Sequence, residues 1–422
     1  MGRTARDNRD RPHPKPVEKI QLSEENVVRR LIAAAIVLVI GGAALAYAFT
    51  QLMAPETGWQ AIEVNTSLGA SCADELVFLY ELGGGSMPVT AENRAVRQLY
   101  SEACRKLFQL FHTVESFEGV TNLRDVNLHP NETLTVDDAL YQAFEAVQRH
   151  GDRTIYLGPV YARYGDLFYC TDDAQLADFD PYRSDEVREE YKAYAAFAQD
   201  PQAVDLRLLG DNQVCLTVSE EYLAFARQEG IERFLDFGWL KNAFIVDYLA
   251  DLMTENGYTH GSISSYDGFS RNIDGREVSY SQNVFDMVDG SVYPAGQMSY
   301  RGPMSIVYLR DYPMNDMDRY WTYQMENGEV RSSYLDPVDG LCRSAVHDLI
   351  CYSQALSCAE IALQTAPIYV ADTLDVQALE GLVKDGIQSI RCEDRKILGT
   401  DSNLKIANLY EEGDVCYSLE TG

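Results

Sequence analysis

The 422-residue sequence predicts an α+β (mixed α/β) fold with mixed sheets, preceded by one N-terminal transmembrane helix. Three observations lead to this prediction. Apolar residues make up 46% of the chain and charged residues 24%, the composition of a globular protein with a sizeable core. Segments with strand and helix periodicity intermix without a strict βαβ rhythm. An uncharged apolar stretch, residues 31–49, follows two arginines near the N-terminus.

The N-terminal region predicts a membrane anchor. Residues 1–30 are polar and rich in Pro and Arg, so we expect a disordered cytoplasmic tail. As a helix, residues 31–49 span roughly 28 Å, about one hydrocarbon core, and residues 31–53 are predicted to form the transmembrane anchor. The basic flank stays cytoplasmic, which makes residues 60–422 an extracytoplasmic domain. A cleaved signal peptide is the alternative, because Ala44-Leu45-Ala46 fits a small-x-small cleavage site.

The charge of the chain is uneven and excludes one class of partner. Residues 1–30 hold eight Lys/Arg and five Asp/Glu. Of the 35 basic and 65 acidic residues in the whole chain, 27 and 60 therefore follow, a net charge of −33. Such a surface repels phosphates, and no basic stripe with interleaved aromatic residues offsets it, so nucleic-acid binding is excluded.

The nine cysteines indicate no zinc site. They are scattered, with no CxxC pair and no CxxH cluster. Because nine is odd, at least one thiol has no partner within the chain. Cys351 and Cys358 lie seven residues apart in a segment predicted to be helical, where two core thiols on one face fit better than a bridge.

The first half of the chain contains several predicted elements. The section 171–200 is acidic and polar, and a solvated insertion containing one helix is the favoured interpretation. Ser219 caps a helix that Gly230 ends. The other expected elements are a strand at 75–80, a helix at 89–112, a helix running from Asp138 to Gly151, and a hairpin at 206–218 turning at Gly210-Asp211-Asn212.

Residues 235–274 form the central predicted unit. A turn at Asp236–Gly238 runs into a helix whose apolar residues recur at three- and four-residue spacing, and Gly257 follows its last turn. A strand at 259–265 brings Asp267 to its carboxyl end. Strand ends and helix N-termini are where such domains bind ligands, particularly phosphates. Later elements are a strand at 304–309, a hairpin turning at Asn327-Gly328, helices at 353–365 and 376–383, and a strand at 387–390.

The order of elements and one motif resemble a known family. Residues 236–247, DFGWLKNAFIVD, align without a gap with the Asp-Leu-Gly-Gly-Ile-Ala-Lys-Gly-x-x-x-Asp motif of the ApbE-type FAD:protein FMN transferases. The resemblance covers roughly residues 60–370. It implies a two-lobed domain with mixed sheets and an extracytoplasmic, magnesium-dependent enzyme. Such an enzyme cleaves the pyrophosphate of FAD and esterifies FMN to a threonine of a partner protein.

The resemblance, together with the loop chemistry, gives the cofactor-binding candidates Asp236, Gly238, Lys241, Asp267 and Arg271. The first two stand at retained motif positions, and Asp267 matches the aspartate of a following Gly-Gly-Asp motif. Lys241 lies one residue before the family lysine. Arg271, in the polar stretch after the strand, offers a guanidinium for a phosphate or carboxylate. Structural alternatives are a helix cap for Asp236, a solvated first-turn residue for Lys241 and a plain turn residue for Asp267.

Several motif positions depart from the family. Trp239 and Ala243 stand at glycine positions, Asn242 takes the place of the lysine, and Ser333 takes that of a histidine. The metal motif Ala-Asp-Ala-x-x-Thr falls on EIALQT, residues 360–365, which makes Glu360 and Thr365 the metal-ligand candidates. Ile361 stands at the aspartate position, where an apolar side chain offers Mg²⁺ no ligand.

These departures favour a degenerate relative that acts as an extracytoplasmic binding or assembly module, with no catalytic residue assigned. The alternative is an active, magnesium-dependent FAD:protein FMN transferase that flavinylates a threonine of a partner. FAD and Mg²⁺ are the cofactors that the resemblance implies. The expected partners are the membrane, through the N-terminal helix, and a second protein. No GxSxG, HExxH, Walker A or GxGxxG context is present to favour other enzyme classes.

Overall fold

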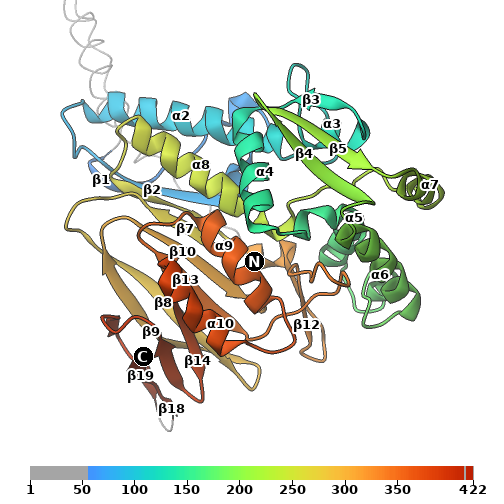
Figure 1. Ribbon diagram of the computed structural model, residues 1–422. Coiled ribbons are helices and arrows are strands. Elements are labelled where there is room, and N and C mark those ends of the chain that lie inside the picture. Colours follow the sequence, from blue (N-terminus) through green and yellow to red (C-terminus); the bar gives the residue numbers. More distant parts are fainter. Residues whose placement is uncertain (1–55, 413–414, 422) are drawn as a thin grey trace, which may run out of the picture. The chain divides into compact units, whose positions relative to one another are not determined.

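A computed structural model describes residues 56–412 and 415–421, and Glu56–Gly422 form one compact unit (Figure 1). This unit has the predicted α+β class, with helices and several sheets. The predicted cytoplasmic tail and membrane anchor, residues 1–53, lie outside the described residues. Among the residues that are described, no helix combines the length and the apolar character needed to cross a bilayer.

A nine-stranded sheet forms the centre of the unit, in the order β1-β2-β6-β7-β10-β13-β14-β15-β19. Neighbouring strands are antiparallel except for β15 and β19, which are parallel. The strands are β1 (Gly58–Ala61), β2 (Leu76–Leu82), β6 (Gly261–Ser265), β7 (Phe269–Asn272), β10 (Met304–Arg310), β13 (Asp348–Ser353), β14 (Gln388–Glu393), β15 (Lys396–Gly399) and β19 (Ser418–Thr421).

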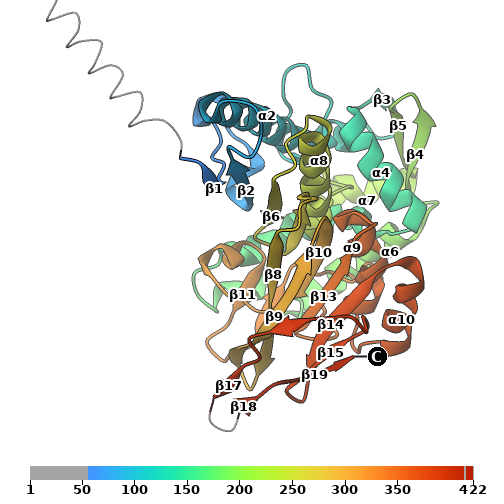
Figure 2. The same ribbon diagram turned by 90° about the vertical axis from the view of Figure 1, so that its left-hand side faces the viewer.

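The sheet separates two hydrophobic cores, and β10 is buried on both of its faces. Val307 belongs to the larger core, under the helices α8 (Lys241–Glu255) and α9 (Cys358–Tyr369). Ile306 points the other way, into a smaller core built with a long hairpin. Figures 1 and 2 show the two helices on one side of the sheet and the hairpin on the other. The sheet that contains this hairpin consists of β8 (Ser279–Val288), β9 (Ser291–Arg301) and β16 (Ile406–Ala407).

The remaining helices pack around α8 and α9. Helix α2 contacts α8, and α4 contacts α9. A small sheet in the order β3-β5-β4 contacts α4 through β4. The elements of this region are α2 (Val89–Leu110), α3 (Leu123–Leu128), β3 (Thr133–Thr135), α4 (Asp138–His150), α5 (Gly158–Tyr164), α6 (Asp185–Gln199), β4 (Val204–Gly210), β5 (Gln213–Val218) and α7 (Glu220–Glu229). The later elements are β11 (Thr322–Gln324), β12 (Val330–Ser332), α10 (Val376–Gly381), β17 (Glu411–Glu412) and β18 (Val415–Cys416).

The predicted helix at 353–365 is wrong at its start. Strand β13 continues through Ser353, and α9 begins only at Cys358. The Ser357 hydroxyl accepts from the Glu360 backbone N–H, while the Glu360 carboxylate accepts from that of Ser357, a capping box that fixes the helix start. Cys351 therefore lies on a strand and Cys358 on a helix, not on one helical face. All nine cysteines are free thiols.

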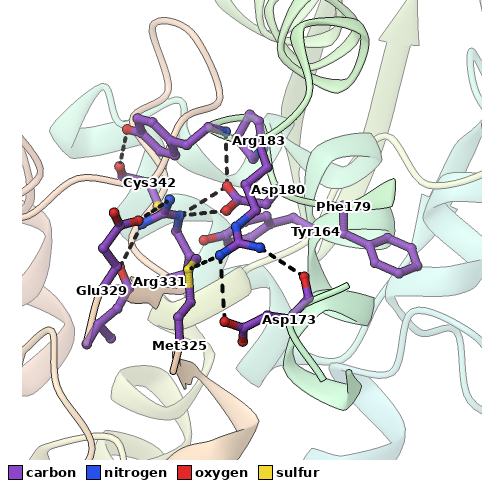
Figure 3. Close-up of polar contacts among 12 residues, drawn as sticks. Tyr164, Asp173, Phe179, Asp180, Arg183, Met325, Glu329, Arg331 and Cys342 are labelled. Carbon is purple, nitrogen blue, oxygen red and sulfur yellow. Dashed lines mark hydrogen bonds and ion pairs between the residues drawn. The ribbon is translucent and has the colours of Figure 1, made fainter. Parts of the chain in front are cut away.

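The acidic section 171–200 is packed, which corrects the expectation of a solvated insertion. Asp180 is fully buried, and the Arg331 Nε lies 3.0 Å from each of its carboxylate oxygens (Figure 3). The Arg331 guanidinium also lies over the Tyr182 ring, 4.6 Å from its centroid. Tyr191 of α6 is buried as well, and its hydroxyl donates to the Phe179 carbonyl at 2.9 Å. This clamp, Asp180–Arg331, ties the section to the β11–β12 hairpin.

Candidate functional site

A cavity of about 650 Å³ lies at the N-terminal end of α8, and we call it the α8 pocket. Four of the five predicted cofactor-binding residues line this pocket, and the fifth, Arg271, does not. In total, five carboxylates and two cations belong to the described residues that line the pocket. The carboxylates are those of Asp74, Glu75, Asp166, Asp236 and Asp267, and the cations are Arg233 and Lys241.

The turn before α8 is held by its own side chains. The Gly238 backbone N–H donates to the Asp236 carboxylate at 2.8 Å, and the Arg233 guanidinium donates to its other oxygen at 3.1 Å. Gly238 has a φ of 52°, and a Cβ at this position would lie 2.2 Å from the Tyr161 ring. Glycine is therefore required here both by backbone conformation and by the close ring. Asp236 therefore stabilises the turn, but its side chain does not cap α8, so the helix cap given as its structural alternative is wrong.

Two acids and two α8 residues form a network beside the turn. The Lys241 ammonium lies 2.8 Å from the Glu75 carboxylate. The Asn242 amide donates to both Glu75 and Asp267, at 2.9 Å in each case. Burial opposes the charge on Glu75, but Lys241 and Asn242 outweigh it and lower the Glu75 pKa. Burial also opposes the charge on Lys241, yet the Glu75 carboxylate raises its pKa overall. This pair is therefore charged at neutral pH.

Asp267 shares the influence of Lys241 with Glu75, which holds the ammonium in a direct ion pair. Burial, together with the nearby Glu75 carboxylate, raises the Asp267 pKa to about 6, although the Ser265 hydroxyl, the Asn242 amide and the Lys241 ammonium oppose the shift. One Asp267 oxygen accepts from Asn242, whereas the other, Oδ1, has no hydrogen-bond partner among the described residues. The Asp267 carboxylate is thus ionised at pH 7 and only partly compensated.

Four buried polar atoms of the α8 pocket have no partner within the part of the chain that is described. They are the Tyr161 hydroxyl, the Trp239 indole Nε1, Asn242 Oδ1 and Asp267 Oδ1. Buried polar atoms are nearly always hydrogen-bonded in folded proteins, and each one left alone costs about 1–3 kcal/mol. All four belong to residues that line one cavity, the α8 pocket.

Aromatic rings form much of the wall. Trp239, at a family glycine position, is 6% exposed and lies parallel to Phe269, with ring centroids 6.5 Å apart. Near the mouth, Tyr169 is 70% exposed and meets Tyr320 with centroids 6.3 Å apart. Phe168 and Trp321 complete the aromatic lining together with Tyr161.

Arg271 lies on β7 and contacts the side of α8 instead of the α8 pocket. Its guanidinium lies 2.8 Å from Asp251 and 3.4 Å from Asp247. The Asp247 carboxylate also accepts from the backbone N–H groups of Cys358 and Ala359, at 2.9 and 2.8 Å. The last aspartate of the α8 motif therefore caps α9, and the arginine neutralises it.

The two predicted metal ligands, Glu360 and Thr365, do not line the α8 pocket. Glu360 caps α9 and accepts a bond from Arg149 at 3.4 Å. Thr365 is fully buried, and its hydroxyl donates to the Ile361 carbonyl one turn earlier, at 2.8 Å. Among the residues described, no group of three His, Cys, Asp or Glu side chains could hold a metal ion. The residues at the family's metal motif therefore do not fit Mg²⁺, which wants several oxygen ligands in octahedral geometry.

Glu75 and Tyr161 are pocket residues that the sequence did not indicate. Glu75 was expected only as the first residue of a strand, and it meets Lys241 across 166 positions of sequence. Tyr161 comes from α5, a helix too short to show a clear periodicity. Asn242 stands at the position of the family lysine, and the sequence did not indicate its hydrogen bonds to the carboxylates of Glu75 and Asp267.

Comparisons with known proteins place the fold. No protein-family model matches the sequence, and no curated protein matches it. Solved structures do. An ApbE protein from Thermotoga maritima is 12% identical with a TM-score of 0.52, over 83% of this chain and 97% of that one. The flavin transferase ApbE from Vibrio cholerae is 15% identical with a TM-score of 0.51, over 79% and 93%. At these identities the likeness shows the fold alone: the described chain has an ApbE-like fold.

Proposed function

We propose that the chain is a membrane-anchored, extracytoplasmic binding or assembly module that keeps the ApbE-like fold and its pocket without transferring flavin. One observation carries this proposal. Both cations that line the described part of the α8 pocket are already neutralised, Lys241 by Glu75 and Arg233 by Asp236. No described cation of the pocket is left to receive the pyrophosphate of FAD.

The charge of the pocket supports the same conclusion. Five carboxylates and two cations leave the described lining at −3 (2 − 5). Phosphoryl chemistry depends on cations or metal ions placed where negative charge develops, and each contributes several kcal/mol. The residues at the metal motif do not fit Mg²⁺, so the negative lining would face a negative ligand directly.

Two bulky side chains at family glycine positions also argue against binding of a pyrophosphate. Trp239 fills one family glycine position with a buried indole, and Tyr266 replaces a glycine at the end of β6. A pyrophosphate is usually held by backbone N–H groups that glycine leaves accessible. The first such N–H in the motif, that of Gly238, already donates to Asp236.

The second candidate is an active, magnesium-dependent FAD:protein FMN transferase. It is favoured by one specific observation: Asp236, Gly238 and Asp267, which match the family motifs, line one pocket in a chain with the fold of the Vibrio cholerae flavin transferase ApbE.

The two functions are separated by a transfer assay. The full-length chain in detergent is incubated with FAD, Mg²⁺ and a threonine-bearing acceptor peptide, and the peptide is analysed by mass spectrometry. The Vibrio cholerae flavin transferase serves as the positive control. We expect no FMN on the peptide and no release of AMP. FMN attached to the peptide would establish the transferase instead.

The membrane anchor is proposed from the uncharged stretch 31–49 and its basic flank. Protease treatment of intact cells tests it, since a protected N-terminal tag combined with digestion of the part after residue 60 is expected. An N-terminal tag lost from the mature chain would indicate a cleaved signal peptide.

A further inference from the structure

We propose that the α8 pocket binds an organic cation, an ammonium or guanidinium group that carries an oxygen acceptor nearby, with Asp267 as its counter-ion. A lysine or arginine side chain of a peptide has this chemistry. The inference rests on the proposed binding function and names the class of ligand for the same site.

The Asp267 carboxylate lacks a directly paired cation. Asp267 accepts one hydrogen bond, from Asn242, and its Oδ1 has none from the described residues. Lys241, the residue before Asn242, is held by Glu75 at 2.8 Å instead. Burial raises the Asp267 pKa to about 6, which reflects a carboxylate without adequate compensation. Lys241 lowers the Asp267 pKa only in part, so a ligand cation would add to a compensation that the protein leaves incomplete.

The second argument is the polarity of the unpartnered atoms. The Asn242 amide nitrogen donates to two carboxylates, which only accept, so the orientation of the amide is fixed. Its Oδ1 is therefore an acceptor, and Asn242 is 3% exposed. Asn242 Oδ1 and Asp267 Oδ1 both require hydrogen-bond donors. An ammonium offers three donors and a guanidinium five.

The third argument comes from the aromatic wall. Trp239 and Tyr161 line the interior, and Tyr169, Tyr320 and Trp321 line the outer part of the cavity. The faces of such rings attract cations, which is how aromatic cages bind ammonium groups. The unpartnered Trp239 Nε1 only donates, so the ligand also needs an oxygen acceptor. A peptide carbonyl beside a basic side chain meets both requirements.

Binding of small probes to the full-length chain in nanodiscs tests the ligand class. The probes are N-acetyl-lysine methylamide, its uncharged norleucine analogue, n-butylammonium and riboflavin, titrated by ligand-observed NMR. We expect the lysine probe to bind at least tenfold more tightly than the norleucine probe. Equal affinity for the two, or tightest binding of riboflavin, would overturn the proposal. Butylammonium binding as tightly as the lysine probe would assign the site to free amines instead of peptides.

Variants test the role of Asp267. Asp267→Asn should weaken the lysine probe at least tenfold, whereas Glu255→Gln, at an exposed acid at the far end of α8 and outside the pocket, should change its affinity less than twofold. Glu75→Gln releases Lys241 toward Asp267, and we expect it to weaken the probe without unfolding the protein. Thermal melting of each variant excludes a folding defect.

The outcomes separate this inference from the proposed function. Unchanged affinity in both Asp267→Asn and Glu75→Gln would refute the counter-ion role, while the absence of flavin transfer would still stand. FMN transfer to a peptide would refute the proposed function regardless of the probe affinities.

Discussion

Asp348 is a buried carboxyl group with a strongly shifted proton affinity. It begins β13, and its Oδ1 accepts hydrogen bonds from the hydroxyls of Tyr308 and Tyr312 at 2.5 and 2.6 Å. Its other oxygen has no partner among the described residues. Burial raises the pKa of Asp348 to about 7 despite the two tyrosines, and the carboxylates of Asp286 and Asp311 add to the shift.

This shift predicts a stability that decreases with pH. Between about pH 4 and pH 7 the folded protein retains a proton on Asp348 that the unfolded chain has released, so the free energy of unfolding falls as pH rises. One such group changes it by up to about 1.4 kcal/mol per pH unit. Asp348→Asn should flatten the slope in urea denaturation, whereas the exposed Asp289→Asn should not. Identical slopes for wild type and Asp348→Asn would contradict the assignment.

Gly238 offers a second test at the level of one residue. Gly238→Ala places a Cβ 2.2 Å from the Tyr161 ring at a φ of 52°, and we expect a loss of about 3 kcal/mol of stability. In a Tyr161→Ala background the loss should fall to about 1 kcal/mol, the backbone cost alone. Gly257→Ala is the control, because its φ is 80° and nothing lies near its Cβ position. Equal losses at Gly238 with and without Tyr161 would show that the ring is not the cause.

Four of the residues singled out from the sequence line one pocket because they belong to one continuous turn, helix and strand. Asp236, Gly238, Lys241 and Asp267 come together through local geometry that the pattern contains. Arg271 does not join them, since it points from β7 toward Asp251 of α8. Contacts such as Lys241 with Glu75 depend on tertiary pairing between distant segments, which no local pattern encodes.

At the level of elements, the clamp Asp180–Arg331 joins the 171–200 section to the β11–β12 hairpin, and both segments lead into walls of the α8 pocket. Asp180→Ala should destabilise the protein by about 3 kcal/mol, since it leaves the buried Arg331 charge with only the exposed Glu329 carboxylate, at 3.3 Å, as a partner. Arg331→Leu added to it should recover part of the loss. Thermal melts of the single and double variants measure the difference, and no recovery in the double variant would contradict the clamp.

The contacts of Glu360 and Thr365 in helix α9 predict that Mg²⁺ does not stabilise the protein. Because Glu360 caps the helix and Thr365 bonds within it, neither Mg²⁺ nor EDTA should shift the melting temperature when the ionic strength is held constant. Glu360→Gln should cost about 0.5–1 kcal/mol through the weakened cap, equally with and without Mg²⁺. Magnesium-dependent stabilisation that disappears in Glu360→Gln would reinstate a metal site here.

Elements with strong turn chemistry were predicted well, and others were not. The hairpins turning at Gly210-Asp211-Asn212 and at Asn327-Gly328 are confirmed, and the helix expected within 171–200 is α6. The hairpin β8–β9 was missed, although Asp289-Gly290, both with positive φ, is a two-residue turn that indicates it. The start of α9 was misplaced because β13 and α9 are both apolar, and only the cap at Ser357 separates them.

At the level of the whole molecule, the net charge of −30 predicts a response to salt. Self-repulsion destabilises a compact anion, and the screening length falls from about 30 Å at 0.01 M salt to about 8 Å at 0.15 M. The melting temperature should therefore rise between 10 and 150 mM NaCl. MgCl₂ at equal ionic strength should give the same rise, and a constant or falling temperature would refute the screening argument.

The strand order of the central sheet could not have been derived from the sequence. The pairings of β2 with β6 and of β7 with β10 join segments separated by whole helices and by the β8–β9 hairpin. The predicted mixture of strands and helices fixes the class, whereas the order depends on which apolar faces meet in three dimensions.

The edges of that sheet have a consequence for aggregation. Strand β1, only four residues long, covers β2, whose sequence LVFLYEL is apolar, rich in β-forming residues and free of proline. Short edge strands limit intermolecular pairing, whereas a long apolar edge is a template for fibrils. Proteolytic nicking between β1 and β2 would release the shorter strand and expose this template. Loss of four residues from the rim would thus convert a soluble sheet into an amyloid-prone one.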